Sequence, residues 1–196
     1  MMAGDNVKSL IVKSATLHFS KYGFHKTTMD EIAKHIHKAK GVLYYYFKSK
    51  EELFREVLKE ELDQVKTELL KITRSEEDPV TIISQYFLTR LKLLSTAVNY
   101  HETIKADFFE KYEFVKDVRD DFSGFERTQL SAILARGKKE GYFVYKDINT
   151  NVNIALMVLN SIELPLFLQG KFVEYEDTIE ELATMIFNSL RTGKTS

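Results

Sequence analysis

The chain has 196 residues, of which 44% are hydrophobic and 29% charged, which is ordinary for a globular protein with room for one core or two small ones. It contains no Cys, which excludes disulfides and thiolate metal sites and fits a reducing compartment. We expect no signal peptide, because the first residues lack a basic segment followed by an apolar one. The most apolar stretch, residues 154–168, is interrupted by Asn160, Glu163 and Pro165, so we expect that it does not span a bilayer and that the protein is cytoplasmic.

The charge of the chain is unevenly distributed. Residues 1–50 hold nine Lys against three acidic residues, a net charge of +6, whereas the other 146 residues carry 19 basic and 26 acidic groups, a net charge of −7. A basic segment attached to an acidic remainder is typical of a module that binds a polyanion. A solvated lysine face with no partner would have the same composition.

The first half of the chain reads as a series of helices. Helical spacing of apolar residues predicts a helix over 6–22, with Gly23 just past its end. Thr28 and Glu31 have the spacing of a capping box and start a short helix over 28–36, and a break of about three residues leads to a second short helix over 39–47. Ser49 and Glu52 form a second capping box, from which one apolar stripe runs to about residue 73.

The second half is also predicted to be helical. Asp78 is a helix cap with Pro79 at the first helical position, and Gly141 is a helix end. The expected helices cover residues 79–98, 101–115, 118–140, 151–169 and 175–191. The helix over 151–169 is apolar on two faces and the last one on a single face. With no convincing strand, the chain is predicted to be all-α, with about nine helices.

Two short helices joined by a tight turn inside a basic segment predict a helix-turn-helix, whose second helix enters the major groove of DNA. At its start, Lys40 can donate to guanine, Gly41 permits close approach of the backbone, and the methyl groups of Val42 can touch a thymine methyl group. Three consecutive tyrosines, residues 44–46, cannot all face the core, so at least one phenol should be exposed. The candidate DNA-binding residues are Thr27, Thr28, Lys38, Ala39, Lys40, Gly41, Val42, Tyr44, Tyr45, Lys48 and Lys50.

The stretch from Phe19 to Ala33, continued from Lys40 to Leu53, closely resembles the TetR/AcrR family of bacterial regulators, and the match extends over about residues 8–55. The resemblance implies a nine-helix homodimer, a variable C-terminal ligand pocket, and repression relieved by a small molecule. The chain departs from the family at the turn. His37 stands where a Gly is usual, Lys38 where a small aliphatic residue is usual, and Ala39 where a capping Ser is frequent. The residue at position 37 needs a positive φ, which His adopts more readily than most residues.

We therefore expect a DNA-binding domain over residues 1–50 and a helical ligand-binding and dimerisation domain over residues 51–196. The helices over about 151–169 and 175–191 suit a four-helix bundle formed by two copies of the chain. The expected partners are double-stranded operator DNA with a pseudo-palindromic sequence, a second copy, and a small effector. When bound to DNA, such a bacterial protein would be associated with the nucleoid.

Aromatic residues gather between positions 86 and 125, with a few polar residues among or beyond them. This pattern is more typical of plain core than of a binding site, but it is the candidate pocket for an apolar or aromatic effector. The candidate pocket residues are Tyr86, Phe87, Arg90, His101, Phe108, Phe109, Phe122, Phe125 and Asn160.

Two other classes of function compete with that of a DNA-binding regulator. The sequence has none of the usual catalytic, nucleotide-binding or zinc-binding motifs, so we expect no enzyme, no metal site and no cofactor. The alternative to a DNA-binding regulator is a helical protein-interaction module that keeps the fold without specific DNA binding, which the altered turn at residues 37–39 leaves open.

Overall fold

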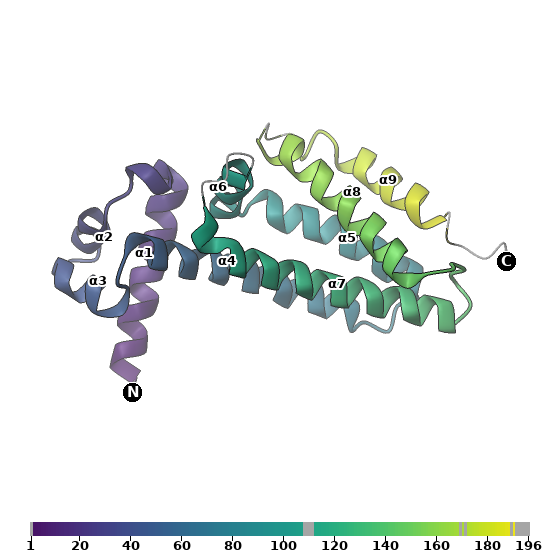
Figure 1. Ribbon diagram of the computed structural model, residues 1–196, viewed down its shortest axis with the longest axis horizontal. Coiled ribbons are helices and arrows are strands. Elements are labelled where there is room, and N and C mark those ends of the chain that lie inside the picture. The colour runs from purple at the N-terminus through teal and green to yellow at the C-terminus, as the bar shows by residue number, and fades with distance from the viewer. Residues whose placement is uncertain (1, 108–111, 169, 171, 189, 191–196) are drawn as a thin grey trace. The chain divides into compact units, whose positions relative to one another are not determined.

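The computed structural model describes residues 2–107, 112–168, 170, 172–188 and 190. Over these residues the protein has nine α-helices, one short 3-10 helix and no strand, which confirms the all-α prediction (Figure 1). The helices in the first half are α1 (Met2–Lys26), α2 (Met29–His35), α3 (Lys40–Tyr46) and α4 (Lys50–Thr73). Those that follow are α5 (Pro79–Ser95), α6 (Val98–Asp107), η1 (Glu113–Val115), α7 (Lys116–Lys139), α8 (Ile148–Leu168) and α9 (Glu176–Asn188).

The chain divides into two compact units. The N-terminal unit consists of Met1–Asp63 and Ala97–Arg119, and the C-terminal unit of Gln64–Thr96 and Asp120–Ser196. Helices α4 and α7 therefore each contribute residues to both units. The expected division into a DNA-binding domain over residues 1–50 and a second domain over residues 51–196 stays a prediction.

The local backbone of the N-terminal unit follows the predicted signals. Gly23 interrupts α1 with φ 79° and ψ 163°, a conformation that costs glycine little. The Thr28 capping box is present in full, because Glu31 N donates to Thr28 Oγ1 and Thr28 N donates to the Glu31 carboxylate. His37 has the expected positive φ, 53°. In the N-terminal unit, α2 packs on both α1 and α3 (Figure 1).

The start of α4 differs in detail from the prediction. Glu52 N donates to Ser49 Oγ as expected, but the Glu52 carboxylate accepts from Lys48 N rather than from Ser49 N. The second capping box is therefore only half formed, with its returning hydrogen bond displaced by one residue.

The predicted boundary between the helices over 79–98 and 101–115 was wrong. Helix α5 ends at Ser95 and α6 begins at Val98. The Glu61 carboxylate accepts from Asn99 Nδ2 at 2.7 Å and from Tyr100 N at 3.1 Å, which satisfies a free amide in the first turn of α6. This partner lies on α4, so local sequence around residue 98 carries no sign of it.

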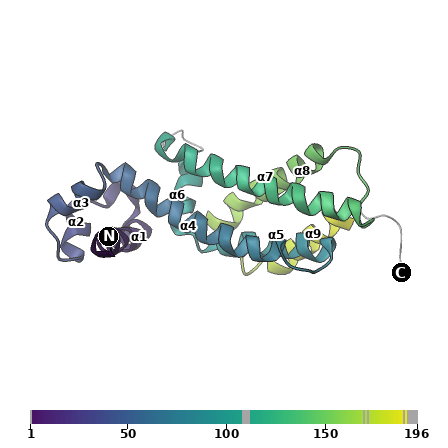
Figure 2. The ribbon, with the colours of Figure 1, turned by 90° about the horizontal axis from the view of Figure 1, so that it is seen from below.

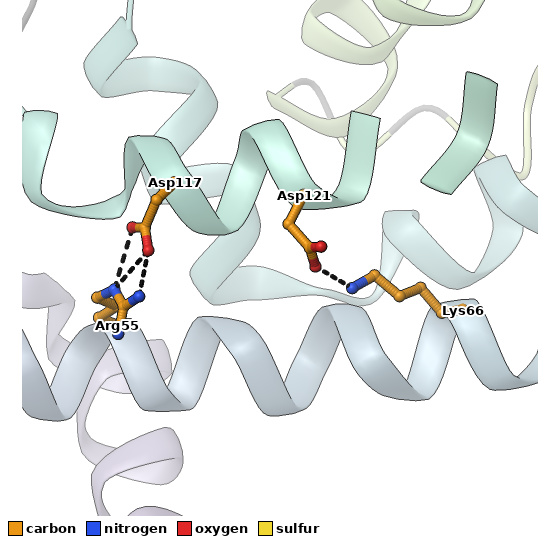
Figure 3. Close-up of polar contacts among 4 residues, drawn as sticks. All are labelled: Arg55, Lys66, Asp117 and Asp121. Atoms are coloured by element: carbon orange, nitrogen blue, oxygen red, sulfur yellow. Dashed lines mark hydrogen bonds and ion pairs between the residues drawn. The ribbon is translucent and has the colours of Figure 1, made fainter. Parts of the chain in front are cut away.

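Ion pairs connect α4 and α7 within each unit. In the N-terminal unit, Arg55 Nε donates to both carboxylate oxygens of Asp117, at 3.0 and 3.1 Å (Figure 3). In the C-terminal unit, Lys66 pairs with Asp121 (Figure 3). Since at least one partner of each pair is exposed, we assign them a small share of the stability.

In the C-terminal unit, α5 packs against α8 and α9 (Figure 2). Helix α8 buries Val152, Ala155 and Leu159, as a core helix does. By length and composition alone, Ile148–Phe167 is long and apolar enough to cross a membrane, so Asn160, Glu163 and Pro165 do not by themselves exclude a span. The burial of Val152, Ala155 and Leu159 in the core accounts for part of this apolar composition.

Candidate nucleic-acid interface

Helix α3 exposes one face and anchors the other. Leu43 is completely buried, whereas Tyr45 is 83% exposed and Tyr44 is 43% exposed, which confirms that at least one phenol lies at the surface. Lys40 and Gly41 are exposed and Val42 partly so. The candidate base-reading residues therefore lie on accessible positions at the N-terminal end of this helix.

Lys40 has an acidic partner that the sequence analysis missed. Its Nζ lies 3.1 Å from Asp30 Oδ1 and 5.7 Å from the centre of the Tyr44 ring. The hydrogen bond with Asp30 raises the pKa of the Lys40 ammonium above its usual value. The pair is about half exposed, so a stronger anion can displace Asp30 at little cost. From the sequence, Asp30 was counted only among the three acidic residues of positions 1–50.

Gly41 has no role within the chain that requires a glycine. Its φ lies outside the left-handed region, and a Cβ atom built on it would have no neighbour within 4 Å. A glycine inside a helix costs about 1 kcal/mol relative to alanine. No contact of the described residues therefore requires a glycine at position 41.

The two threonines before α2 differ in availability. Thr28 is exposed and holds the capping box, whose hydrogen bonds lower the pKa of the Glu31 carboxyl. Thr27 is 1% exposed, and its hydroxyl donates to Gly23 O at 2.9 Å. Thr27 therefore supports the fold, and among these two only Thr28 is positioned to meet a phosphate.

The lysines after α3 also differ. Lys48 and Lys38 are exposed. Lys50 Nζ donates to Phe24 O at 2.8 Å and to Thr27 O at 3.0 Å, and it lies 4.4 Å from the centre of the Phe24 ring. Its ammonium group thus holds the segment between α1 and α2, which positions α2 rather than extending toward a ligand.

The turn between α2 and α3 keeps a closed backbone despite its unusual residues. His37 N donates to Lys34 O at 3.1 Å and Lys38 N donates to Ala33 O at 3.0 Å. Ala39 provides no side-chain cap for α3, because its methyl group cannot accept a hydrogen bond. The departures at His37, Lys38 and Ala39 therefore cost α3 one side-chain cap, and the backbone of the turn is preserved.

Among the candidate pocket residues, Arg90 lies at the centre of a buried charge cluster in the C-terminal unit. Arg90 is completely buried and pairs with Glu126 of α7 and with Glu163 of α8. Its Nη2 also donates to Asn160 Oδ1 at 3.3 Å. We refer to Arg90, Glu126 and Glu163 as the Arg90 cluster. Arg90 and Asn160 were among the candidate pocket residues, but Glu126 and Glu163 were not. The position of Glu163 in an otherwise apolar segment was a signal that its carboxylate is buried with a partner.

The Arg90 cluster has an electrostatic imbalance, because two carboxylates share one guanidinium. Burial raises the pKa of Glu126, against the opposing effect of Arg90. Tyr86 lies near this cluster, completely buried, and burial together with Glu126 raises the pKa of its phenol far above the usual value. Within the described part of the chain, Tyr86 Oη has no hydrogen-bond partner.

The other candidate pocket residues are dispersed. Phe87 of α5 meets Phe187 of α9 with ring centres 5.3 Å apart, and the rings of Phe122 and Phe125 stack at 6.4 Å. His101 belongs to the N-terminal unit, and Phe108 and Phe109 lie outside the described residues. No group of three or more metal-ligating side chains occurs in the described ranges.

Helices α8 and α9 leave apolar side chains at the surface. Met157 of α8 is 63% exposed and Met185 of α9 is 64% exposed. Between the two helices lies an apolar groove of about 270 Å³ with Ile162, Leu166 and Leu182 in its walls. This groove contains none of the candidate pocket residues.

The chain is similar to known regulators of transcription. Residues 11–57 match the family model described as bacterial regulatory proteins, tetR family. The HTH-type transcriptional regulator QacR of Staphylococcus aureus is 29% identical over 165 residues, which cover 80% of this chain and 84% of that protein. RutR of Escherichia coli K12, also an HTH-type transcriptional regulator, is 40% identical over 137 residues, which cover 68% of this chain and 63% of RutR.

The fold also matches solved structures. A transcriptional regulator from Cytophaga hutchinsonii superposes with a TM-score of 0.75 at 26% identity, over 94% of this chain and 98% of that one. The similarity in fold therefore extends well beyond the helix-turn-helix segment into the helices of the C-terminal unit.

Proposed function

Because the chain belongs to the TetR family of bacterial transcriptional regulators, we propose that it is a ligand-responsive repressor that binds a pseudo-palindromic operator as a homodimer. A small effector bound in the C-terminal unit releases it from DNA in the cytoplasm. The observation that carries the DNA-binding part of the proposal is the exposed start of α3, where Lys40 has only a half-exposed ion pair with Asp30 and no neighbour in the chain requires a glycine at position 41.

On DNA, α3 lies in the major groove. Lys40 leaves Asp30 and donates to a guanine edge, Gly41 allows the helix to approach, and Val42 contacts a thymine methyl group. The surrounding phosphates are met by residues whose side chains are exposed at the edges of the two short helices, namely Thr28, Lys38, Tyr44, Tyr45 and Lys48. Ala39 provides backbone at the helix start, and Lys50 and Thr27 position α2.

The homodimer forms through α8 and α9. Their exposed methionines and the apolar groove between them are faces that a second copy would bury. A two-fold arrangement places two α3 helices about one turn of DNA, about 34–36 Å, apart. This spacing is why we propose a pseudo-palindromic operator.

The effector binds near Tyr86 in the C-terminal unit. The Tyr86 hydroxyl is buried without a partner beside the Arg90 cluster, and the rings of Phe87 and Phe122 supply apolar surface in the same unit. An apolar or aromatic compound with one hydrogen-bonding group fits this chemistry. His101 is not part of this proposed site, because it belongs to the other unit.

Selection of bound DNA from a random pool, followed by gel shift at increasing salt, tests the proposal. We expect a two-fold symmetric consensus and an affinity that falls steeply with salt, because phosphate contacts release counterions. Sedimentation should give a dimer at micromolar concentration. A monomer in solution would contradict the dimer. Failure to enrich any sequence even at low salt would favour the second candidate function, a protein-interaction module. The observation that supports this second candidate is the unusual turn at His37, Lys38 and Ala39.

A further inference from the structure

A groove in the N-terminal unit shares His37 with the turn before α3 and otherwise lies apart from the sites described so far. It has a volume of about 360 Å³ and runs between α1 and the end of α2. Its α1 wall includes Leu10, Lys13 and Leu17, and its other wall includes His35 and His37. A volume of this size falls in the range of pockets that hold small organic molecules, about 300–1,000 Å³.

The two kinds of side chain in the groove suit different parts of one ligand. Leu10, Leu17 and Ile36 give it apolar surface, and Leu17 is 61% exposed although it lies on a helix of the protein core. Lys13 is exposed and contributes a positive charge, and the imidazoles of His35 and His37 contribute N–H donors. None of the described residues that line the groove is acidic.

Ser14 gives an independent sign of a missing ligand. Its side chain lines the groove and is only 3% exposed, yet among the described residues its Oγ has no hydrogen-bond partner. Buried hydroxyls are normally hydrogen-bonded, because leaving one unsatisfied costs free energy. An acceptor that enters the groove beside Lys13 can take this hydrogen bond.

We propose that this groove is a binding site for a small amphiphilic anion, a carboxylate attached to an apolar body. The apolar body covers Leu10 and Leu17, and the carboxylate accepts from Lys13 and from the Ser14 hydroxyl. The site is separate from the effector site proposed in the C-terminal unit. It contacts His37, the residue with positive φ in the turn that leads to α3.

The test uses the full chain with labelled methyl groups of Leu and Ile, and octanoate as the probe. Octanoate should shift the methyl signals of Leu10, Leu17 and Ile36 saturably. Octanol, which lacks the charge, and acetate, which lacks the apolar body, should bind at least about tenfold more weakly. Because the signals are assigned to single residues, binding of octanoate in the C-terminal unit cannot be mistaken for binding in this groove.

Two variants check the anion contact. Lys13→Gln should weaken octanoate binding about threefold to tenfold, because it removes one partly solvated charge. Ser14→Ala should weaken it by a smaller factor, and Lys21→Gln, on the same helix but outside the groove, should leave the dissociation constant unchanged. Both lysines are exposed, so their variants should fold like the parent chain.

Four results would overturn the proposal. The first is that the methyl signals do not respond to octanoate, and the second is that octanol binds as tightly as octanoate. The third is an unchanged dissociation constant for octanoate in Lys13→Gln. The fourth is a response of these methyl groups to operator DNA but not to octanoate. The last result would make the groove a contact for DNA phosphate instead.

Discussion

Two groups of charged side chains, one in each unit, are used in opposite ways. In the N-terminal unit, Lys40 and Asp30 form a pair that stays about half exposed. In the C-terminal unit, Arg90, Glu126 and Glu163 are all removed from water and held by one another. A solvated pair is worth little and exchanges partners easily, whereas a buried cluster tolerates no missing member. Exposed charge therefore suits a surface that meets DNA, and buried charge fixes how three helices pack.

The largest expected effect comes from removing the arginine of the Arg90 cluster. Arg90→Met should destabilise the protein by about 3–5 kcal/mol, because it leaves two carboxylates buried without a counter-charge. Denaturant unfolding measures this loss. Arg55→Met removes the exposed partner of Asp117 and should cost only about 0–1 kcal/mol.

The triple variant Arg90→Met, Glu126→Gln and Glu163→Gln sharpens this test. It removes the charges together and should recover much of the stability lost in the single variant, since buried ion pairs are often replaceable as a set. Equal losses in Arg90→Met and Arg55→Met would contradict the difference that we draw between the two units.

The second effect concerns DNA rather than stability. Lys40→Glu should weaken operator binding about 10- to 100-fold, because it replaces a donor to a base edge with a carboxylate beside phosphates. Its fold should be preserved, because Lys40 is exposed. Gel shift with the selected operator gives the affinity.

Asp30→Asn is the matched control for this variant. It releases Lys40 from its partner without adding a negative charge, so operator affinity should stay the same or rise slightly. An unchanged affinity in Lys40→Glu would exclude the proposed docking of α3.

These contrasts also explain how much the sequence could predict. The Thr28 capping box, the positive φ of His37 and an exposed tyrosine in α3 depend on residues only a few positions apart, so local pattern was sufficient. Glu126, one of the two carboxylate partners of Arg90, is 36 residues away on another helix, and the partner of Asn99 is 38 residues away. No local signal specifies such pairs, and the same reason accounts for the misplaced boundary between α5 and α6.

Helix caps give a smaller effect that both units share. Thr28→Ala and Asp78→Ala should each lower stability by about 1 kcal/mol, since each side chain satisfies free amides at a helix start. Only Thr28→Ala should also weaken operator binding, because only α2 lies in the helix-turn-helix. Unfolding and gel shift on the same preparations separate the two readouts, and a matching loss of DNA affinity in Asp78→Ala would mean that stability alone accounts for it.

The smallest effect is a change of stability with pH, and it concerns the largely buried carboxylate of Glu61 in the N-terminal unit. Burial raises the pKa of Glu61, although hydrogen bonds from Asn99 and Tyr100 oppose the rise. The folded protein therefore keeps this proton at a pH where the unfolded chain, with a pKa of about 4.5, has lost it. The resulting stabilisation of the folded state is complete below the unfolded-state pKa and decreases as the pH rises through the folded-state pKa.

Glu61→Gln removes this titration while keeping an acceptor for the start of α6. Relative to the variant, the wild-type chain should therefore lose stability as the pH rises above about 4.5, measured as the difference in unfolding midpoint. A difference that stays constant would mean that the hydrogen bonds to α6 offset the burial of the carboxylate. In that event Glu61 would behave like a solvated carboxylate although it is largely buried.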